Sequence, residues 1–331
     1  MAPVKLIIQI PCFNEEKHLP ETLEALPTEI EGVDIIERLV IDDGSADRTA
    51  EVARACGGEH VIRLASNRGL ANAFRTGVRR CLELGADIIV NTDADNQYHG
   101  GDIPKLVAPV VEGRADMVIG DRQIASHREF GAIKKFLQRL GSQVISTVAG
   151  VEVSDATSGF RAISRDLALR LNVISSFTYT HETIIQAGLS GLHIENVPIR
   201  TNLKTRPSRL FRSTFGYIRR SAITIIRIYV LYRPFMVFST LAGLTLLPGV
   251  AIGARFLNFY ISGDGDGHVQ SLLLSVVLLN LSFILALLAV LADLIGANRR
   301  LIEETLSHAR ANALERRLRG VAPGGDDAGR A

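Results

Sequence analysis

The chain has 331 residues, of which 47% are hydrophobic, and a formal net charge of +2. This length and apolar content suffice for one large or two ordinary globular domains, and the small net charge argues against a nucleic-acid-binding protein. Three cysteines that lie far apart in the sequence indicate neither a disulfide framework nor a zinc site. The partners of the protein must therefore be sought in local patterns.

Short apolar runs alternate with stretches of helical spacing from residue 5 to about residue 199. The runs are KLIIQI, IIERLVI, HVIRLA, ADIIV and DMVIG. Such alternation is typical of βα units, whose strands form a mostly parallel sheet with helices on both faces. We therefore predict a Rossmann-like α/β domain over residues 1–212.

A basic segment follows this domain. Residues 199–234 contain nine Lys or Arg residues and no Asp or Glu. Within this segment, residues 213–234 mix arginines with aromatic and aliphatic side chains, which favours an amphipathic helix that lies on a membrane surface. A plain solvated helix is the alternative interpretation.

Two long uncharged runs come next, at residues 235–254 and 269–292. A helix needs about 20 apolar residues to cross the hydrocarbon layer. We therefore predict a membrane domain at 235–296, with spans at about 235–257 and 269–293, and a tail at 297–331 whose end is disordered. Buried helices of a soluble core are the alternative.

The charges around these runs predict an orientation. The connecting loop ISGDGDGH carries no Lys or Arg, whereas arginines flank both runs on the outside, at positions 227, 233, 299 and 300. The positive-inside rule places such flanks in the cytoplasm. The sequence thus predicts a multi-pass protein of the cell membrane, with both termini and the N-terminal domain cytoplasmic.

An acidic cluster stands directly after the apolar run ADIIV. Asp93, Asp95 and Gln97 occupy alternate positions in the stretch NTDADNQYHG. Ligands of open parallel sheets bind beyond the carboxyl ends of the strands. Hard oxygen donors without Cys or His neighbours suit Mg²⁺ or Mn²⁺, and phosphates often complete the shell of Mg²⁺. The cluster predicts a metal and a diphosphate substrate, with a helix cap or turn as the alternative.

Two other strand ends carry polar groups. IPCFNEE follows the first apolar run and IDDGSADRT ends the second. Glu15 and either Asp42 or Asp43 could accept hydrogen bonds from a nucleoside, although DDGS alone is also a good turn and helix cap. Together with the acidic cluster, these ends predict one ligand site on one edge of the sheet.

Six motifs occur in a fixed order over residues 5 to about 235: PCFNE, DDGSADRT, NRGLANAFRTG, DADNQ, VIGDR and SDATSGFRA. In this order they resemble glycosyltransferase family 2 enzymes of the GT-A fold, and above all the polyprenyl-phosphate glycosyltransferases. The resemblance implies transfer of a sugar from a UDP- or GDP-sugar to a polyprenyl phosphate such as an undecaprenyl, decaprenyl or dolichyl phosphate. It also implies dependence on Mg²⁺ or Mn²⁺ and inversion at the anomeric carbon.

The resemblance also implies the residues that hold the donor. The implied nucleotide-binding residues are Pro11, Phe13, Glu15 and Asp43. The implied metal and diphosphate motif comprises Asp93, Ala94, Asp95 and Gln97. Asp95 and Gln97 would be the direct metal ligands, and Asp93 would lie nearer the sugar.

A second group of implied residues concerns the acceptor. Arg122 and Arg161 lie where the sugar and the acceptor phosphate would meet. Asp155 matches the position usually offered as the base, with a turn or cap carboxylate as the alternative. Arg206, in the basic stretch LKTRPSRL, would belong to a loop over the diphosphate.

Two departures from the family pattern narrow the prediction. The chain contains no tryptophan, so it lacks the QxxRW motif of processive family members, and transfer of a single sugar is favoured. TYTHET, residues 178–183, differs from the mannose synthases and leaves the identity of the donor sugar open.

Alternatives from the sequence are a transferase for another membrane lipid, a membrane nucleotidyltransferase and a non-enzymatic scaffold. Membrane lipids are expected partners, and a homo-oligomer stays open.

Overall fold

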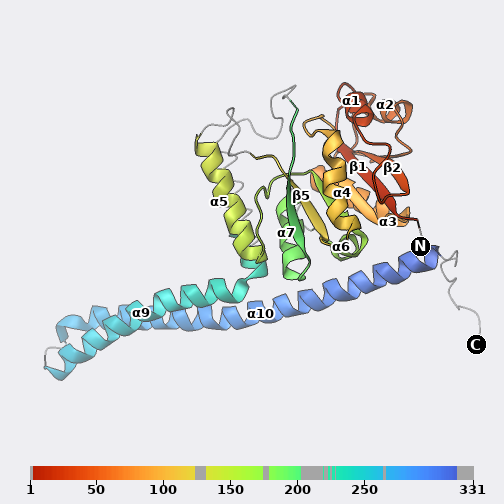
Figure 1. Cartoon of the computed structure of the whole chain (residues 1–331). Coiled ribbons are helices and arrows are strands. Elements are labelled where there is room, and N and C mark those ends of the chain that lie inside the picture. Colours follow the sequence, from red (N-terminus) through yellow and green to blue (C-terminus); the bar gives the residue numbers. More distant parts are fainter. Residues whose placement is uncertain are drawn as a thin grey trace, which may run out of the picture. The chain divides into compact units, whose positions relative to one another are not determined.

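The computed structural model describes residues 3–123, 132–173, 179–202, 219, 223, 226–227, 229–263 and 266–318 (Figure 1). The chain divides into two compact units. The first unit comprises Met1–Ser221 with Glu304–Ala331, and the second comprises Ala222–Glu303.

A seven-stranded sheet lies at the centre of the first unit. Its strands are β1 (Lys5–Cys12), β2 (Ile35–Asp42), β3 (His60–Arg63), β4 (Ile88–Asn91), β5 (Met117–Asp121), β6 (Arg161–Ser164) and β7 (Ile194–Pro198), in the order β3-β2-β1-β4-β6-β5-β7. β6 runs antiparallel to β4 and β5, and the other neighbouring pairs are parallel. The prediction of an α/β fold with a mostly parallel sheet is confirmed, whereas the reversed strand β6 was not predicted.

Helices connect the strands of this sheet. They are α1 (Leu19–Glu24), α2 (Thr49–Ala55), α3 (Leu70–Glu83), α4 (Ile103–Val111), α5 (Ala132–Ala149), α6 (Arg165–Arg170) and α7 (Thr180–Leu189), with a 3₁₀ turn at Gly100–Asp102. β1 and β2 lie side by side, and so do β2 and β3, each pair joined through a helix. This is the arrangement that βα units give.

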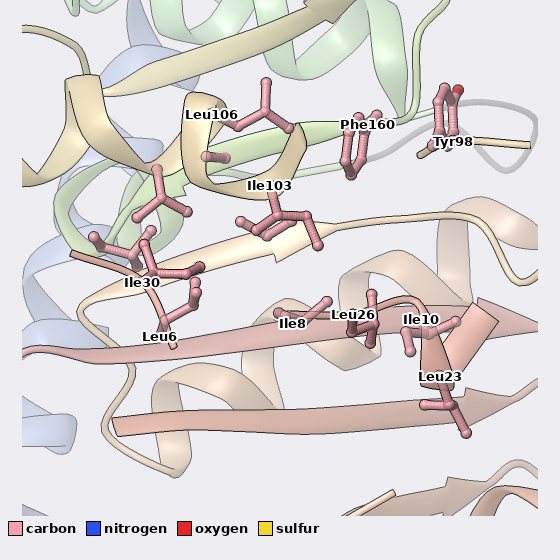
Figure 2. Packing of buried hydrophobic residues seen from close by; sticks show 14 of the residues in the cluster. Leu6, Ile8, Ile10, Leu23, Leu26, Ile30, Tyr98, Ile103, Leu106 and Phe160 are labelled. Carbon is pink, nitrogen blue, oxygen red and sulfur yellow. The ribbon is translucent and has the colours of Figure 1, made fainter. Parts of the chain in front are cut away.

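The two faces of β1 bury different helices because side chains alternate along a strand. Leu6, Ile8 and Ile10 are fully buried in a cluster with residues of α1 and α4 (Figure 2). Burying one such side chain stabilises the fold by about 1.5–3 kcal/mol. This cluster holds β1 in place, and the loop that follows β1 belongs to the candidate site described below.

The opposite face of β1 contacts α3 at a glycine. A Cβ added to Gly77 would lie 2.8 Å from Cδ1 of Ile41 and closer still to Oε1 of Gln9. Gln9 is fully buried and donates a hydrogen bond to Asn91 on β4 (3.0 Å). Gly77 therefore permits the close packing of α3 on the sheet that the small residues of NRGLANAFRTG suggest.

The second unit is a helical hairpin of α9 (Pro234–Ile261) and α10 (Val269–Leu318), of which α10 continues into the first unit. Within the hairpin, Ser275 donates to the carbonyl of Gly249 (2.7 Å) and Ser282 donates to that of Ala242 (2.9 Å). Both helices are long and apolar enough to be candidate membrane spans. Small residues and serine hydroxyls at a helix contact are typical of membrane helices.

The helices extend beyond the predicted spans. α10 continues past position 293 because no proline interrupts it and because Arg299 pairs with Glu303 one turn later (2.8 Å). Its last turns belong to the first unit, where Arg310 donates to the carbonyl of Leu171 (2.8 Å). Most of the predicted amphipathic helix, 213–234, lies outside the described residues, as does the end of the tail.

We expect Gly77→Ala to destabilise the first unit by about 1–3 kcal/mol because the added methyl group overpacks the contact between α3 and the sheet. Thermal unfolding of the purified protein would measure this loss. Arg75→Ala, an exposed substitution in the same helix, should change stability by less than about 0.5 kcal/mol. Equal melting temperatures of wild type and Gly77→Ala would contradict the tight contact.

Candidate active site

The topology brings one end of each of the seven strands to one edge of the sheet. β1, β2, β4 and β5 run in the same direction, so their carboxyl ends share this edge. Because β6 is antiparallel to β4 and β5, its first residue, rather than its last, comes to the same edge. The stretch SDATSGFR, which leads into β6, therefore joins the loops that follow the parallel strands. We call this place the carboxyl edge.

The loops after β1 and β2 are tied together. The backbone N–H of Asp43 donates to the carbonyl of Cys12 (2.9 Å), and that of Asn14 donates to Ser45 Oγ (2.8 Å). The side chain of Asp43 accepts hydrogen bonds from the backbone of Arg68 and Gly69 (2.9 and 2.8 Å). The Asp43 carboxylate thus holds the NRG loop against the carboxyl edge.

The predicted nucleotide residues lie at this end of the edge. Pro11, near the end of β1, and Glu15 are buried, whereas Phe13 is 38% exposed. An exposed aromatic ring beside buried polar groups is a surface on which a base can stack. The structure brings these residues and Asp43 together, and their contact with a nucleotide stays a prediction.

The DADNQ loop follows β4, the neighbour of β1. The backbone N–H of Gln97 donates to the Asp95 carboxylate (3.2 Å), and Ala94 is buried with its carbonyl accepting from Thr22 (3.1 Å). Beyond β7, the backbone N–H of Asn202 donates to the carbonyl of Gln97 (2.9 Å). The loop is therefore held by α1 and by the segment that follows β7.

Asp93 is surrounded by charged groups. Burial and then the negative charge of Asp95 raise the pKa of Asp93 to about 7, with a further contribution from Glu15. Arg122 and a hydrogen bond with Tyr98 act in the opposite direction. These influences show that the loops after β1, β4 and β5 face one another.

Arg122 and Asp155 form a two-pronged ion pair across the edge. Arg122 Nε and Nη2 donate to the two carboxylate oxygens of Asp155 (2.7 and 3.0 Å), and Nη2 also donates to Thr157 (2.7 Å). Gln138 of α5 donates to Asp155 as well (3.2 Å). Burial acts to raise the pKa of Asp155, but the Arg122 guanidinium outweighs it and holds this pKa below its usual value.

The geometry of Asp155 suits a group that positions Arg122. Arg122 Nε and Nη2 donate to the two oxygens of Asp155, so the carboxylate fixes the orientation of the guanidinium. The part of Asp155 as the base stays a prediction.

Arg161 lies in the interior, with 2% of its surface exposed. Its guanidinium donates to the carbonyls of Ala156, Ser158 and Thr180 and to the Thr183 hydroxyl (2.7 to 3.0 Å). Burial lowers the pKa of Arg161 to about 10, still well above neutral pH. Arg161 therefore joins the loop before β6 to the start of α7, and direct contact with a phosphate stays a prediction.

The donor set at the carboxyl edge fits a divalent cation. The described residues contain no group of three or more His, Cys, Asp or Glu that could hold a metal ion. Asp95 and Gln97 are both partly exposed, and Mg²⁺ is usually held by one or two carboxylates while phosphates and water fill the remaining positions. Burial and then the negative charge of Asp95 raise the pKa of Asp93, and a cation bound nearby would offset that negative charge. Arg206 lies outside the described residues.

The sequence did not indicate several residues that build this edge. Tyr98 accepts a hydrogen bond from the backbone of Gly159 (3.0 Å) and stacks on Phe160 with ring centres 4.9 Å apart. Asn91 donates to the carbonyl of Gly159 and to Tyr179 (2.8 and 2.9 Å). The polar groups of Tyr98 and Asn91 lie close to a predicted strand end, and this was the only indication of a role that the sequence offered. The partners of both residues lie at least 61 residues away in the sequence.

Sequence similarity to known proteins identifies the family of this chain. Residues 7–171 match the Glycosyl transferase family 2 domain. An uncharacterized protein of Methanocaldococcus jannaschii is 36% identical over 203 residues, which cover 60% of this chain and 81% of that protein. The chain belongs to glycosyl transferase family 2.

Two named relatives of this family-2 enzyme act on lipid phosphates, according to their names. The UDP-N-acetylglucosamine–dolichyl-phosphate N-acetylglucosaminyltransferase of Methanococcus voltae is 30% identical, with 61% of this chain and 87% of the relative covered. The undecaprenyl-phosphate mannosyltransferase of Micrococcus luteus is 31% identical, with coverages of 59% and 83%. The family-2 assignment makes the chain a glycosyltransferase and sets aside the nucleotidyltransferase alternative.

A solved structure of the same fold supports the GT-A assignment. The glucosyl-3-phosphoglycerate synthase of Mycobacterium tuberculosis, solved with Mn²⁺, UDP and glucosyl-3-phosphoglycerate, gives a TM-score of 0.51 at 23% identity. The match covers 68% of this chain and 79% of the synthase. The predicted GT-A fold is confirmed.

We expect Asp155→Asn to lower the free energy of unfolding at pH 7 by on the order of 3 kcal/mol because it leaves the largely buried Arg122 without its counter-charge. Since the folded pKa of Asp155 lies below its usual value of 3.8, the wild-type contribution is present above that pH and is lost as the pH falls further. The difference in melting temperature between the two proteins should therefore shrink from pH 7 to pH 3. A constant difference would show that the ion pair does not stabilise the fold.

Proposed function

We propose that the protein transfers a single sugar from a nucleoside-diphosphate sugar to a polyprenyl phosphate at the cytoplasmic face of a membrane. The observation that carries this proposal is the carboxyl edge, where Asp93, Asp95 and Arg122 converge in a family-2 domain that a pair of long apolar helices follows. The names of the dolichyl-phosphate and undecaprenyl-phosphate relatives support the acceptor.

The proposed domain organisation follows from the same features. A cytoplasmic catalytic domain covers about residues 1–212, an amphipathic segment 213–234 lies at the membrane surface, and residues 235–296 cross the membrane twice. The helical end of α10, Glu304–Leu318, is added to the catalytic unit because it groups with that unit. Arginines on the outer flanks of both spans favour the cytoplasmic side.

The order of the strands suggests how the substrates are arranged. Asp43, Phe13 and Glu15 belong to the β2 and β1 end of the edge, where we place the nucleoside. Asp93 and Asp95 follow β4 in the middle, and Arg122 and Asp155 lie at the β5 and β6 end. The sugar then lies between the nucleoside and the acceptor phosphate, so that the attacking oxygen and the leaving diphosphate lie on opposite sides of the anomeric carbon.

In the proposed reaction an oxygen of the lipid phosphate attacks the anomeric carbon of the sugar. The bond from that carbon to the diphosphate oxygen breaks, and nucleoside diphosphate leaves. A phosphate monoester is largely ionised near pH 7, since its second pKa is about 6, so the attacking oxygen needs little help from a base. Arg122, held in place by Asp155, would orient the phosphate and balance its charge.

Asp95 and Gln97 would hold the divalent cation, Mg²⁺ or Mn²⁺. When bound, the cation neutralises charge that grows on the leaving diphosphate. Asp93 would bind nearer the sugar, and Ala94 would keep the loop compact beneath it. Manganese and UDP in the Mycobacterium tuberculosis synthase support this assignment.

The reaction can be tested directly with the full-length protein in detergent or lipid nanodiscs. We expect incubation with the correct nucleotide sugar and a polyprenyl phosphate to yield a polyprenyl-phosphate monosaccharide and nucleoside diphosphate, both detectable by mass spectrometry. A lipid product with two or more sugars, or transfer to a glycolipid but not to the phosphate, would overturn the proposal.

The metal ligands can be tested by thermal unfolding with UDP-, GDP- and TDP-sugars, with and without Mg²⁺. The correct donor should raise the melting temperature, because a ligand at about 100 times its Kd stabilises the folded state by about 2.7 kcal/mol. Asp95→Ala should remove the part of this rise that depends on Mg²⁺. Asp166→Ala, an exposed substitution in the first turn of α6 and away from the carboxyl edge, should keep it. A full Mg²⁺ effect in Asp95→Ala would show that the metal binds elsewhere.

A further inference from the structure

His181 is the exception in a buried stretch of α7. From Tyr179 to Ala187, every residue but His181 is buried, and His181 is partly exposed. This stretch packs closely, since Tyr179 stacks on Phe74 of α3 with ring centres 3.9 Å apart. His181 thus keeps a partly exposed surface at the start of a helix whose first two turns otherwise face the core.

The start of α7 is fixed against the carboxyl edge. Arg161 donates to the carbonyl of Thr180 (2.7 Å) and to the hydroxyl of Thr183 (2.8 Å), and it also donates to the carbonyls of Ala156 and Ser158. The same loop carries Asp155, which pairs with Arg122 at the end of β5. Thus one buried guanidinium links the helix that carries His181 to the residues that we place around the acceptor and the sugar.

The hydrogen bonding of His181 fixes its tautomer. Its Nδ1 is buried and has no hydrogen-bond partner among the described residues. A buried N–H without an acceptor costs more than an unfilled acceptor lone pair, so we assign the proton to Nε2. Burial and the positive charge of Arg161 lower the pKa of His181 to about 4. The side chain is therefore a neutral imidazole that offers one N–H donor.

We propose that His181 is a specificity residue for the transferred sugar, to which its Nε2–H donates a hydrogen bond. A neutral donor suits a neutral sugar oxygen, whereas the phosphates are better matched by the Arg122 guanidinium. The hydrogen bond would then distinguish donors that differ in the position or orientation of one hydroxyl group. This inference rests on the proposed transfer from a nucleotide sugar, and it adds a residue outside the nucleotide and metal motifs.

The experiment compares the intact donor with its nucleotide part. Binding of UDP, GDP and a panel of their sugars to the full-length protein is measured by calorimetry for wild type, His181→Leu and His181→Gln. Because the amide nitrogen of Gln occupies about the place of Nε2, His181→Gln retains the donor, whereas His181→Leu lacks it. His193→Leu is the matched control, since His193 is exposed and precedes β7 at the opposite edge of the sheet.

We expect His181→Leu to weaken the preferred donor by about tenfold relative to a donor with the same nucleotide and an altered sugar. Binding of the free nucleoside diphosphate should stay within about twofold, and His181→Gln should restore most of the preference. An unchanged preference in His181→Leu, or an equal loss of nucleoside-diphosphate binding, would overturn the inference.

The binding comparison needs no acceptor, so its result is separable from that of the transfer assay. If wild type binds a donor but transfers nothing to polyprenyl phosphate, the proposed acceptor fails while the sugar preference still decides the role of His181. If wild type binds no nucleotide sugar, both proposals fail. The melting temperatures of the His181 variants check that each variant is folded.

Discussion

The ion pair between Arg122 and Asp155 is the interaction on which the candidate site depends. It joins the end of β5 to the segment that leads into the antiparallel strand β6. Both side chains are largely buried, so each charge would be costly without the other. Arg122 also donates to Thr157 in the loop before β6, and Gln138 of helix α5 donates to the same hydroxyl. A buried pair of this kind contributes less to stability than to a fixed position for one guanidinium at the carboxyl edge.

The electrostatics of the edge support the proposed binding of a cation. Asp93, Asp95 and Glu15 place negative charge in one region, and the pKa of Asp93 rises because that charge is crowded and partly buried. Arg122 faces the same region, but Asp155 already balances it. A diphosphate that arrived without a cation would meet net negative charge. A divalent cation bound at the acidic motif would therefore offset the charge of both the carboxylates and the donor phosphates.

The sequence predicted the fold well where its patterns are local. Apolar runs located β1 to β5, and residue composition located the apolar helices α9 and α10. β6 has four residues and is bonded to distant strands, so no local period marks it. The motifs placed Asp93, Asp95 and Arg122 near one another, but they could not show that Arg161 is fully enclosed or that Asp155 has both oxygens occupied. Those facts depend on which side chains meet across the sheet, and a single sequence does not encode that in any short pattern.

The occupied carboxylate of Asp155 has a consequence for the chemistry of the acceptor. A sugar hydroxyl keeps its proton at neutral pH, and an enzyme that used such an acceptor would need a base with an accessible lone pair. A lipid phosphate arrives already ionised and needs a positive partner instead. The carboxyl edge offers a guanidinium held in place by a carboxylate. A guanidinium held in this way can form charged hydrogen bonds with an anionic acceptor, which supports the proposed phosphate acceptor.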